Sequence, residues 1–303
     1  MSFYGREDFE GFVYLDIDHP LVAWNTVRGV YCSVDCLGDG ERESALSLSM
    51  ANMMRGFTQE RLKSEMAIEY VRRAFFGGHV SRLRGVFVFD DVDSISKLWY
   101  GGEWGHHFHD KYMTDVGVSA NKSCRLDANW IMEIMDPMGR LTDDWLKCAK
   151  NYWSGLPHPI KEPIWERIVE GWVTIWGVDI KNRACDEISK YWPESLKLLE
   201  YSCNAAMIGS NDGLVTAFLT REREYANVDF YLRLVDAKKE STFERIKDFF
   251  EQYPEKRAFT NARPVLSTID MSHLSLKIPI DGSIEFLVWK DGKVETNFQP
   301  PIK

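Results

Sequence analysis

The stretch YVRRAFFGGHVSRLRGVFVF, residues 70–89, brings together a helix end, a polar corner and a short apolar run. Its first part has the spacing of a helix that a glycine pair ends, and its last part, 86–89, is typical of a buried strand. Between them, Ser81 and Arg82 place a hydroxyl and a guanidinium at the mouth of a strand, where small ligands often bind. Arg82 could clamp a pyrophosphate there; a solvated arginine in a serine-containing turn is the plainer interpretation.

A second apolar segment holds a carboxylate in an unusual place. We expect strands at 164–169 and 172–178, joined by a tight hairpin at Glu170 and Gly171. Glu166 lies inside the first strand, where aromatic and apolar neighbours would partly desolvate it. Desolvation raises the pKa of a carboxyl unless a hydroxyl or a cation pairs with it. An exposed strand face that carries Glu166 into solvent is the alternative.

Taken together, the two segments resemble ADP-ribosyltransferase-like domains of bacteria and phages, in an uncharacterised group with a Pro-Ser-Arg-Leu element, over about residues 25–180. Val80 stands here at the proline position. The resemblance implies that Glu166 stabilises the oxocarbenium-like centre as nicotinamide leaves NAD, and that Ser81 helps to hold Glu166. Arginine-modifying members carry a second Glu two positions earlier; Ile164 stands there, so modification of protein arginine is not implied.

The resemblance also implies residues that grip NAD. The dipeptide Arg28-Gly29 resembles the one that grips the cofactor in the family, although a surface arginine is the alternative. Arg82 is the second candidate for the pyrophosphate. Trp104, His107 and Tyr112 could stack on the nicotinamide or adenine ring.

A Gly-rich and His-rich stretch, 101–117, is expected to be a loop. His106, His107 and His109 lie within four positions, which would suit a divalent metal and hence a metal-dependent hydrolase. A plain surface loop is the other interpretation, because no further ligand pattern accompanies these histidines.

The fold class expected from these patterns is α+β with two domains. Residues 1–185 would form an ADP-ribosyltransferase-like mixed sheet with helices, and 186–303 a smaller α+β domain of unknown role. Three strands near 274–278, 284–289 and 293–296 would form a β-meander in the second domain. The remaining patterns predict helices at 43–57, 59–75, 93–99, 142–152, 187–201 with a break at Pro193, and 241–253, and a strand at 228–235.

Composition narrows the function further. The net charge is -9 and the pI is near 5.4, which argues against nonspecific nucleic-acid binding. No apolar stretch is long enough to span a membrane and no signal peptide is visible, so a cytoplasmic location without a membrane is expected. The leading hypothesis is an NAD-dependent mono-ADP-ribosyltransferase or NAD glycohydrolase with NAD as substrate and a protein or other macromolecule as acceptor. Acidic charge and abundant aromatic residues equally suit a non-catalytic inhibitor or adaptor that binds a protein.

Overall fold

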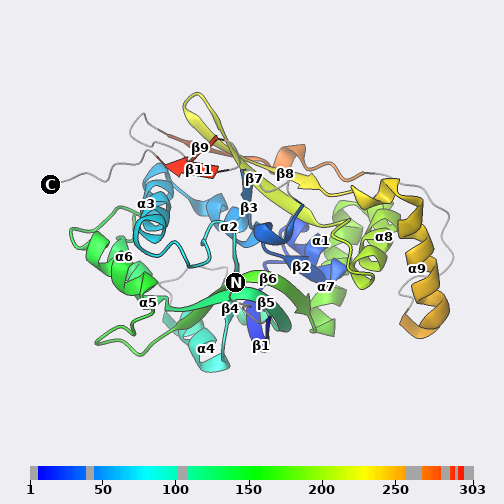
Figure 1. Ribbon diagram of the computed structural model, residues 1–303, viewed down its shortest axis with the longest axis horizontal. Helices are drawn as coiled ribbons and strands as arrows, with labels where there is room; N and C mark the ends of the chain where they lie inside the picture. The colour runs from blue at the N-terminus through cyan, green and yellow to red at the C-terminus, as the bar shows by residue number, and fades with distance from the viewer. Residues whose placement is uncertain are drawn as a thin grey trace, which may run out of the picture.

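The computed structural model describes residues 6–38, 44–101, 108–256, 268–280, 287–290 and 293–296. Within them the chain is a mixed α+β protein built on antiparallel sheets (Figure 1). This confirms the expected α+β class, whereas an ADP-ribosyltransferase fold stays a prediction. Among the described residues, no helix combines the length and the apolar composition that crossing a bilayer requires.

The larger sheet is a five-stranded one that closes on itself. Its members are β1 (Glu7–Tyr14), β2 (Val30–Cys32), β4 (Val86–Phe89), β5 (Met113–Asp127) and β6 (Trp165–Ile175). The order is β2-β6-β4-β1-β5, and β6 also pairs with β5, so that β6, β4, β1 and β5 form a ring. The ring closes between β1 and β4 through one residue pair, Phe12 with Phe89.

Strand β6 is continuous, so the predicted hairpin at Glu170 and Gly171 is wrong. Gly171 pairs with Ala120 of β5 in the middle of the strand. A Cβ at position 171 would lie 2.3 Å from the carbonyl oxygen of Ser119. The glycine is therefore needed because two strands approach closely, and not because the chain turns.

A second, four-stranded sheet has the order β3-β7-β8-β9. Its strands are β3 (Ala45–Leu46), β7 (Val215–Glu222), β8 (Tyr225–Leu232) and β9 (Leu276–Pro279). The predicted strand at 228–235 is confirmed as β8, three residues earlier. The predicted meander is only partly confirmed: β10 (Leu287–Lys290) and β11 (Lys293–Thr296) form an antiparallel pair, but β9 pairs with β8.

Nine α-helices lie in the described residues: α1 (Pro20–Arg28), α2 (Leu48–Met53), α3 (Gln59–Phe75), α4 (Val92–Gly101), α5 (Asn129–Ile134), α6 (Trp145–Trp153), α7 (Val178–Tyr191), α8 (Leu196–Met207) and α9 (Glu240–Gln252). Helix α3 matches its predicted bounds, because the hydroxyl of Thr58 accepts a hydrogen bond from the Arg61 amide at 3.2 Å and caps it. The predicted helix 43–57 is shorter, since Ala45–Leu46 pairs with β7. The expected loop 101–117 ends early, because β5 begins at Met113.

The helices cover the larger sheet in two groups (Figure 1). Helices α3, α5 and α6 pack a core against Leu126 and Ile168, whereas α1, α7 and α8 pack against Val116 and Val173. The N-terminal part of the chain also reaches beyond the expected boundary at 185: α1 packs on α8, and β3 completes the second sheet. The two-domain division stays a prediction, but main-chain pairing crosses its boundary.

Candidate functional site

The Ser-Arg corner and the β6 carboxylate, predicted as neighbours from segments 84 residues apart, do lie together. Arg82 follows the end of α3 and donates from Nη1 to Oε1 of Glu166 at 3.1 Å. The hydroxyl of Tyr152, on α6, donates to the same oxygen at 2.7 Å. Glu166 is only 6% exposed, so the alternative of a solvated strand face is excluded.

Ser81 binds a different carboxylate from the one expected. Its hydroxyl donates to Oε2 of Glu69, on α3, at 2.9 Å. Glu69 also accepts from Arg72 at 2.8 Å and from Arg73 at 2.9 Å. The implied contact of Ser81 with Glu166 is therefore replaced by one with Glu69, because the corner folds back onto α3.

Arg82 is the central cation of this buried cluster. Its Nε lies 3.2 Å from Oε2 of Glu65, and its guanidinium lies over the rings of Phe87 and Tyr152 at 5.0 and 5.5 Å. Burial alone would lower the pKa of Arg82. The adjacent Glu65, together with Tyr152 and Glu166, outweighs burial and raises that pKa well above its usual value. For Glu166 burial prevails over the attraction of Arg82, and the pKa of its carboxyl is raised.

The cluster is closed rather than open to a ligand. Ser81, Arg82 and Glu166 are each at most 6% exposed. A ligand the size of NAD needs a cleft of several hundred Å³. In this conformation the arrangement joins α3, α6 and β6 through charge-assisted hydrogen bonds.

Arg28, expected to grip the cofactor, lies elsewhere and is buried. Its Nε donates to the carbonyl of Asp212 at 3.1 Å and its Nη2 to the carbonyl of Ser210 at 2.6 Å, while Nη1 donates to the carbonyl of Val30. Burial lowers its pKa to about 10. The structure therefore brings Ser81, Arg82 and Glu166 into one region but leaves Arg28 holding α1 against the segment that precedes β7.

The predicted stacking and metal-binding residues are only partly visible. Trp104, His106 and His107 lie outside the described residues. Tyr112 is buried directly before β5, where its hydroxyl donates to Asp18. His109 is exposed, and no group of His, Cys, Asp or Glu within the described ranges could hold a metal ion. The metal-dependent hydrolase stays a prediction, which metal analysis of chelator-free protein would test.

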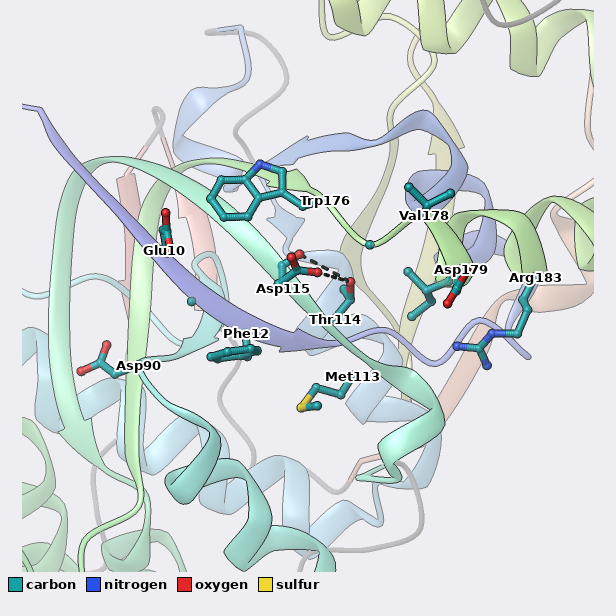
Figure 2. A pocket seen from close by; sticks show the side chains of 13 residues that line it. Glu10, Phe12, Asp90, Met113, Thr114, Asp115, Trp176, Val178, Asp179 and Arg183 are labelled. Atoms are coloured by element: carbon teal, nitrogen blue, oxygen red, sulfur yellow. Dashed lines mark hydrogen bonds between the residues drawn. The ribbon is translucent and has the colours of Figure 1, made fainter.

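An open groove of about 860 Å³ lies on β1, β5 and the junction of β6 with α7 (Figure 2). Phe12 and Trp176 contribute aromatic surface, and Val178 begins the helix that borders the groove. Trp176 is 42% exposed and Val178 64% exposed, so both present apolar surface to solvent at the groove. Four carboxylates, Glu10, Asp90, Asp115 and Asp179, share the lining with one cation, Arg183.

Glycines shape this groove. A Cβ at Gly117 would lie 2.5 Å from Cζ2 of Trp176, so the absence of a side chain lets the indole rest on β5. A Cβ at Gly177 would lie 2.1 Å from Oγ1 of Thr114, so glycine is also needed where the chain passes from β6 into α7. The position of Trp176 is thus fixed by backbone contacts, including the hydrogen bond that its amide donates to the Asp115 carbonyl at 3.1 Å.

Of the four carboxylates that line the groove, only Asp90 forms ion pairs with described residues. Asp90 accepts from Arg125 at 2.6 Å and also from Arg167. Arg183 donates to the carbonyl of Lys111 at 2.5 Å. In contrast, no cation of the described chain forms an ion pair with the remaining three carboxylates, Glu10, Asp115 and Asp179. Among the described residues, three of the four carboxylates that line the groove thus lie outside any ion pair, and Arg183 is the one cation of that lining.

The groove and the buried cluster point to opposite sides of β6. Glu166 turns toward Arg82 and α6, whereas the next residue, Arg167, turns toward Asp90 at the groove. The groove is thus a separate candidate site. Sequence reasoning missed it because its residues come from four distant segments; the only local signal is an aromatic residue followed by Gly177 at a helix start.

Comparison with known proteins adds no relative. No family model matches the sequence, and no curated protein matches it.

Proposed function

We propose that this protein acts by binding another protein through the groove on β1, β5 and α7, as an inhibitor or adaptor. The observation that supports this proposal is the exposed Trp176, held in place over Gly117 beside carboxylates without ion-pair partners. Fixed, exposed aromatic side chains are typical anchors of protein interfaces. A volume near 860 Å³ is large enough to receive side chains of a partner.

Photo-crosslinking tests the proposal directly. A photoreactive amino acid replaces Val178, at the groove, and in a matched protein it replaces Val235, which is 44% exposed but does not line the groove. In cells from which the sequence comes, we expect a discrete adduct from position 178 that position 235 does not give. Trp176→Ala should abolish the adduct. Adducts at both positions, or at neither, would contradict the proposal.

NAD cleavage is the second candidate, favoured by the proximity of Glu166 to the Ser-Arg corner, which the resemblance led us to expect. Under this proposal NAD displaces Arg82 and Tyr152 from Glu166, and the freed carboxylate stabilises positive charge as the glycosidic bond breaks.

NAD consumption by the purified protein tests this candidate. We expect Glu166→Gln to lose turnover, while Glu194→Gln, an exposed carboxylate outside the cluster, retains it. Melting temperatures measured alongside ensure that only folded variants are compared. Equal turnover by the protein and by Glu166→Gln removes Glu166 from the chemistry.

A further inference from the structure

We infer that the groove receives an arginine side chain of the partner protein, stacked on Trp176 and held by Asp115. This inference rests on the binding function proposed above and names the chemistry of its ligand. Three features support it: carboxylates that form no ion pair among the described residues, an exposed indole, and arginine side chains that lie over two other tryptophan rings of the chain.

The first feature is charge. Glu10, Asp115 and Asp179 line the groove without an ion-pair partner among the described cations. Figure 2 shows Glu10 on one side of the view and Asp179 on the other, with Asp115 between them. Such a distribution attracts a cation and repels phosphate or carboxylate groups. Nucleotides, nucleic acids and acidic peptides are therefore poor ligands for this groove.

The second feature is that an aromatic side chain and a carboxylate line the same groove. The Trp176 amide donates a hydrogen bond to the Asp115 carbonyl at 3.1 Å, so the backbones that carry the two side chains are joined directly. A guanidinium can stack on an indole and donate to a carboxylate at the same time, because it is planar and carries several N–H groups. An ammonium group offers a point charge and suits such a site less well.

The third feature is a pattern within the protein. Arg125 lies over the ring of Trp165 at 3.8 Å, and Arg6 lies over the ring of Trp172 at 5.7 Å. Trp165 and Trp172 thus each hold an arginine of the same chain. Trp176, the next tryptophan along the sequence, has no cation over its ring from the described residues. An arginine from outside would complete the same arrangement.

Tryptophan indole signals in a nitrogen-15 spectrum give a test with single-residue resolution. The protein has 11 Trp, and the Trp176 signal is the one that Trp176→Phe removes. The probe is a blocked tri-arginine peptide, compared with blocked tri-lysine and tri-glutamate. We expect tri-arginine to shift the Trp176 signal in a saturable and salt-sensitive way, tri-lysine to shift it less, and tri-glutamate to leave it unchanged.

Variants locate the binding. Trp176→Ala, followed by calorimetry, should weaken tri-arginine binding about fivefold or more, because a cation–π contact is lost. Asp115→Asn should weaken it about threefold, whereas Asp143→Asn, an exposed carboxylate on another part of the chain, should not. An unmoved Trp176 signal, or equal shifts with tri-glutamate, overturns the inference.

The crosslinking experiment separates failure of this inference from failure of the binding function. An adduct at position 178 that excess tri-arginine and high salt both suppress supports an arginine ligand. An adduct that neither suppresses overturns the arginine inference and leaves the binding function standing. The absence of any adduct at position 178 overturns both.

Discussion

Arg82 is the residue on which the buried cluster depends, because it separates the carboxylates of Glu65 and Glu166. Arg82→Ala leaves both carboxylates buried without their shared cation. We expect this change to lower the free energy of unfolding by about 3–5 kcal/mol, measured by urea denaturation.

The matched control is Arg140→Ala, because Arg140 pairs with Asp136 at the surface. Removing an exposed pair should cost about 0–1 kcal/mol. If the two variants are equally stable, the cluster does not hold the helices to the sheet as its geometry indicates.

The raised pKa of Glu166 predicts a pH dependence of stability. The folded protein holds the Glu166 proton more tightly than the unfolded chain does, since burial raises the pKa above its usual 4.5. The free energy of unfolding should therefore fall as the pH rises from about that value through the raised pKa. Glu166→Gln should remove this decline, and a series of urea denaturation curves from pH 4.5 to neutrality compares the two proteins.

The carboxyl of Glu65, whose pKa is shifted in the opposite direction, checks the sign of this pH dependence. Burial would raise the pKa of Glu65, but Arg82 and Arg61 outweigh it and lower that pKa. Stability that depends on Glu65 is thus lost as the pH falls below 4.5, in a separate window. If the stability of the wild-type protein and that of Glu166→Gln change in the same way between pH 4.5 and neutrality, Glu166 does not titrate as described.

At the scale of single helices and strands, the sequence predicted the features that residues close together in the chain determine. Thr58 caps α3 where the sequence places the cap, and the apolar run 86–89 forms β4. Gly171 was misread, because a glycine between two apolar runs has the same signature whether the chain turns or another strand approaches. The proximity of Glu166 to the Ser-Arg corner was predicted only through the family resemblance, whereas its direct contact with Arg82 and its burial were not predicted.

Substitution of Gly171 tests whether β5 and β6 approach each other as closely as the structure indicates. Gly171→Ala would place a methyl group against the Ser119 carbonyl, so we expect a loss of about 1–3 kcal/mol in the free energy of unfolding. Gly78→Ala is the control, since nothing lies within 4 Å of a Cβ built there. Chemical denaturation of both variants decides the matter: an unaffected Gly171→Ala protein would mean that the strands do not approach so closely.

For the molecule as a whole, α1 and β3 connect the early part of the chain to the late part. The Trp24 indole donates to the Gly213 carbonyl at 2.8 Å, and Asn25 exchanges two hydrogen bonds of 2.9 Å with Val215. The core that contains Met50 and Leu62 also includes Val228 of β8. Much of the apolar surface of the first 185 residues is thus covered by the later part of the chain.

A fragment of residues 1–185 should therefore not fold cooperatively by itself. We expect it to aggregate, or to unfold without a sharp transition in circular dichroism, while the full chain melts cooperatively. A soluble fragment with a sharp transition would instead establish the first domain as independent, as the sequence initially suggested. Co-expression with residues 186–303 is the control, because it restores the missing partner surfaces.

The closed ring of strands has a consequence for how the protein is made. Strand β6 comes last of the five along the sequence, yet it pairs with β2, β4 and β5. While the ribosome is still translating the residues before 165, those three strands have hydrogen-bonding edges that nothing in the nascent chain can cover. We therefore expect newly made chains to recruit chaperones while β6 is still untranslated, so that ribosome-bound chains stalled before residue 165 bind more chaperone than the released full-length chain.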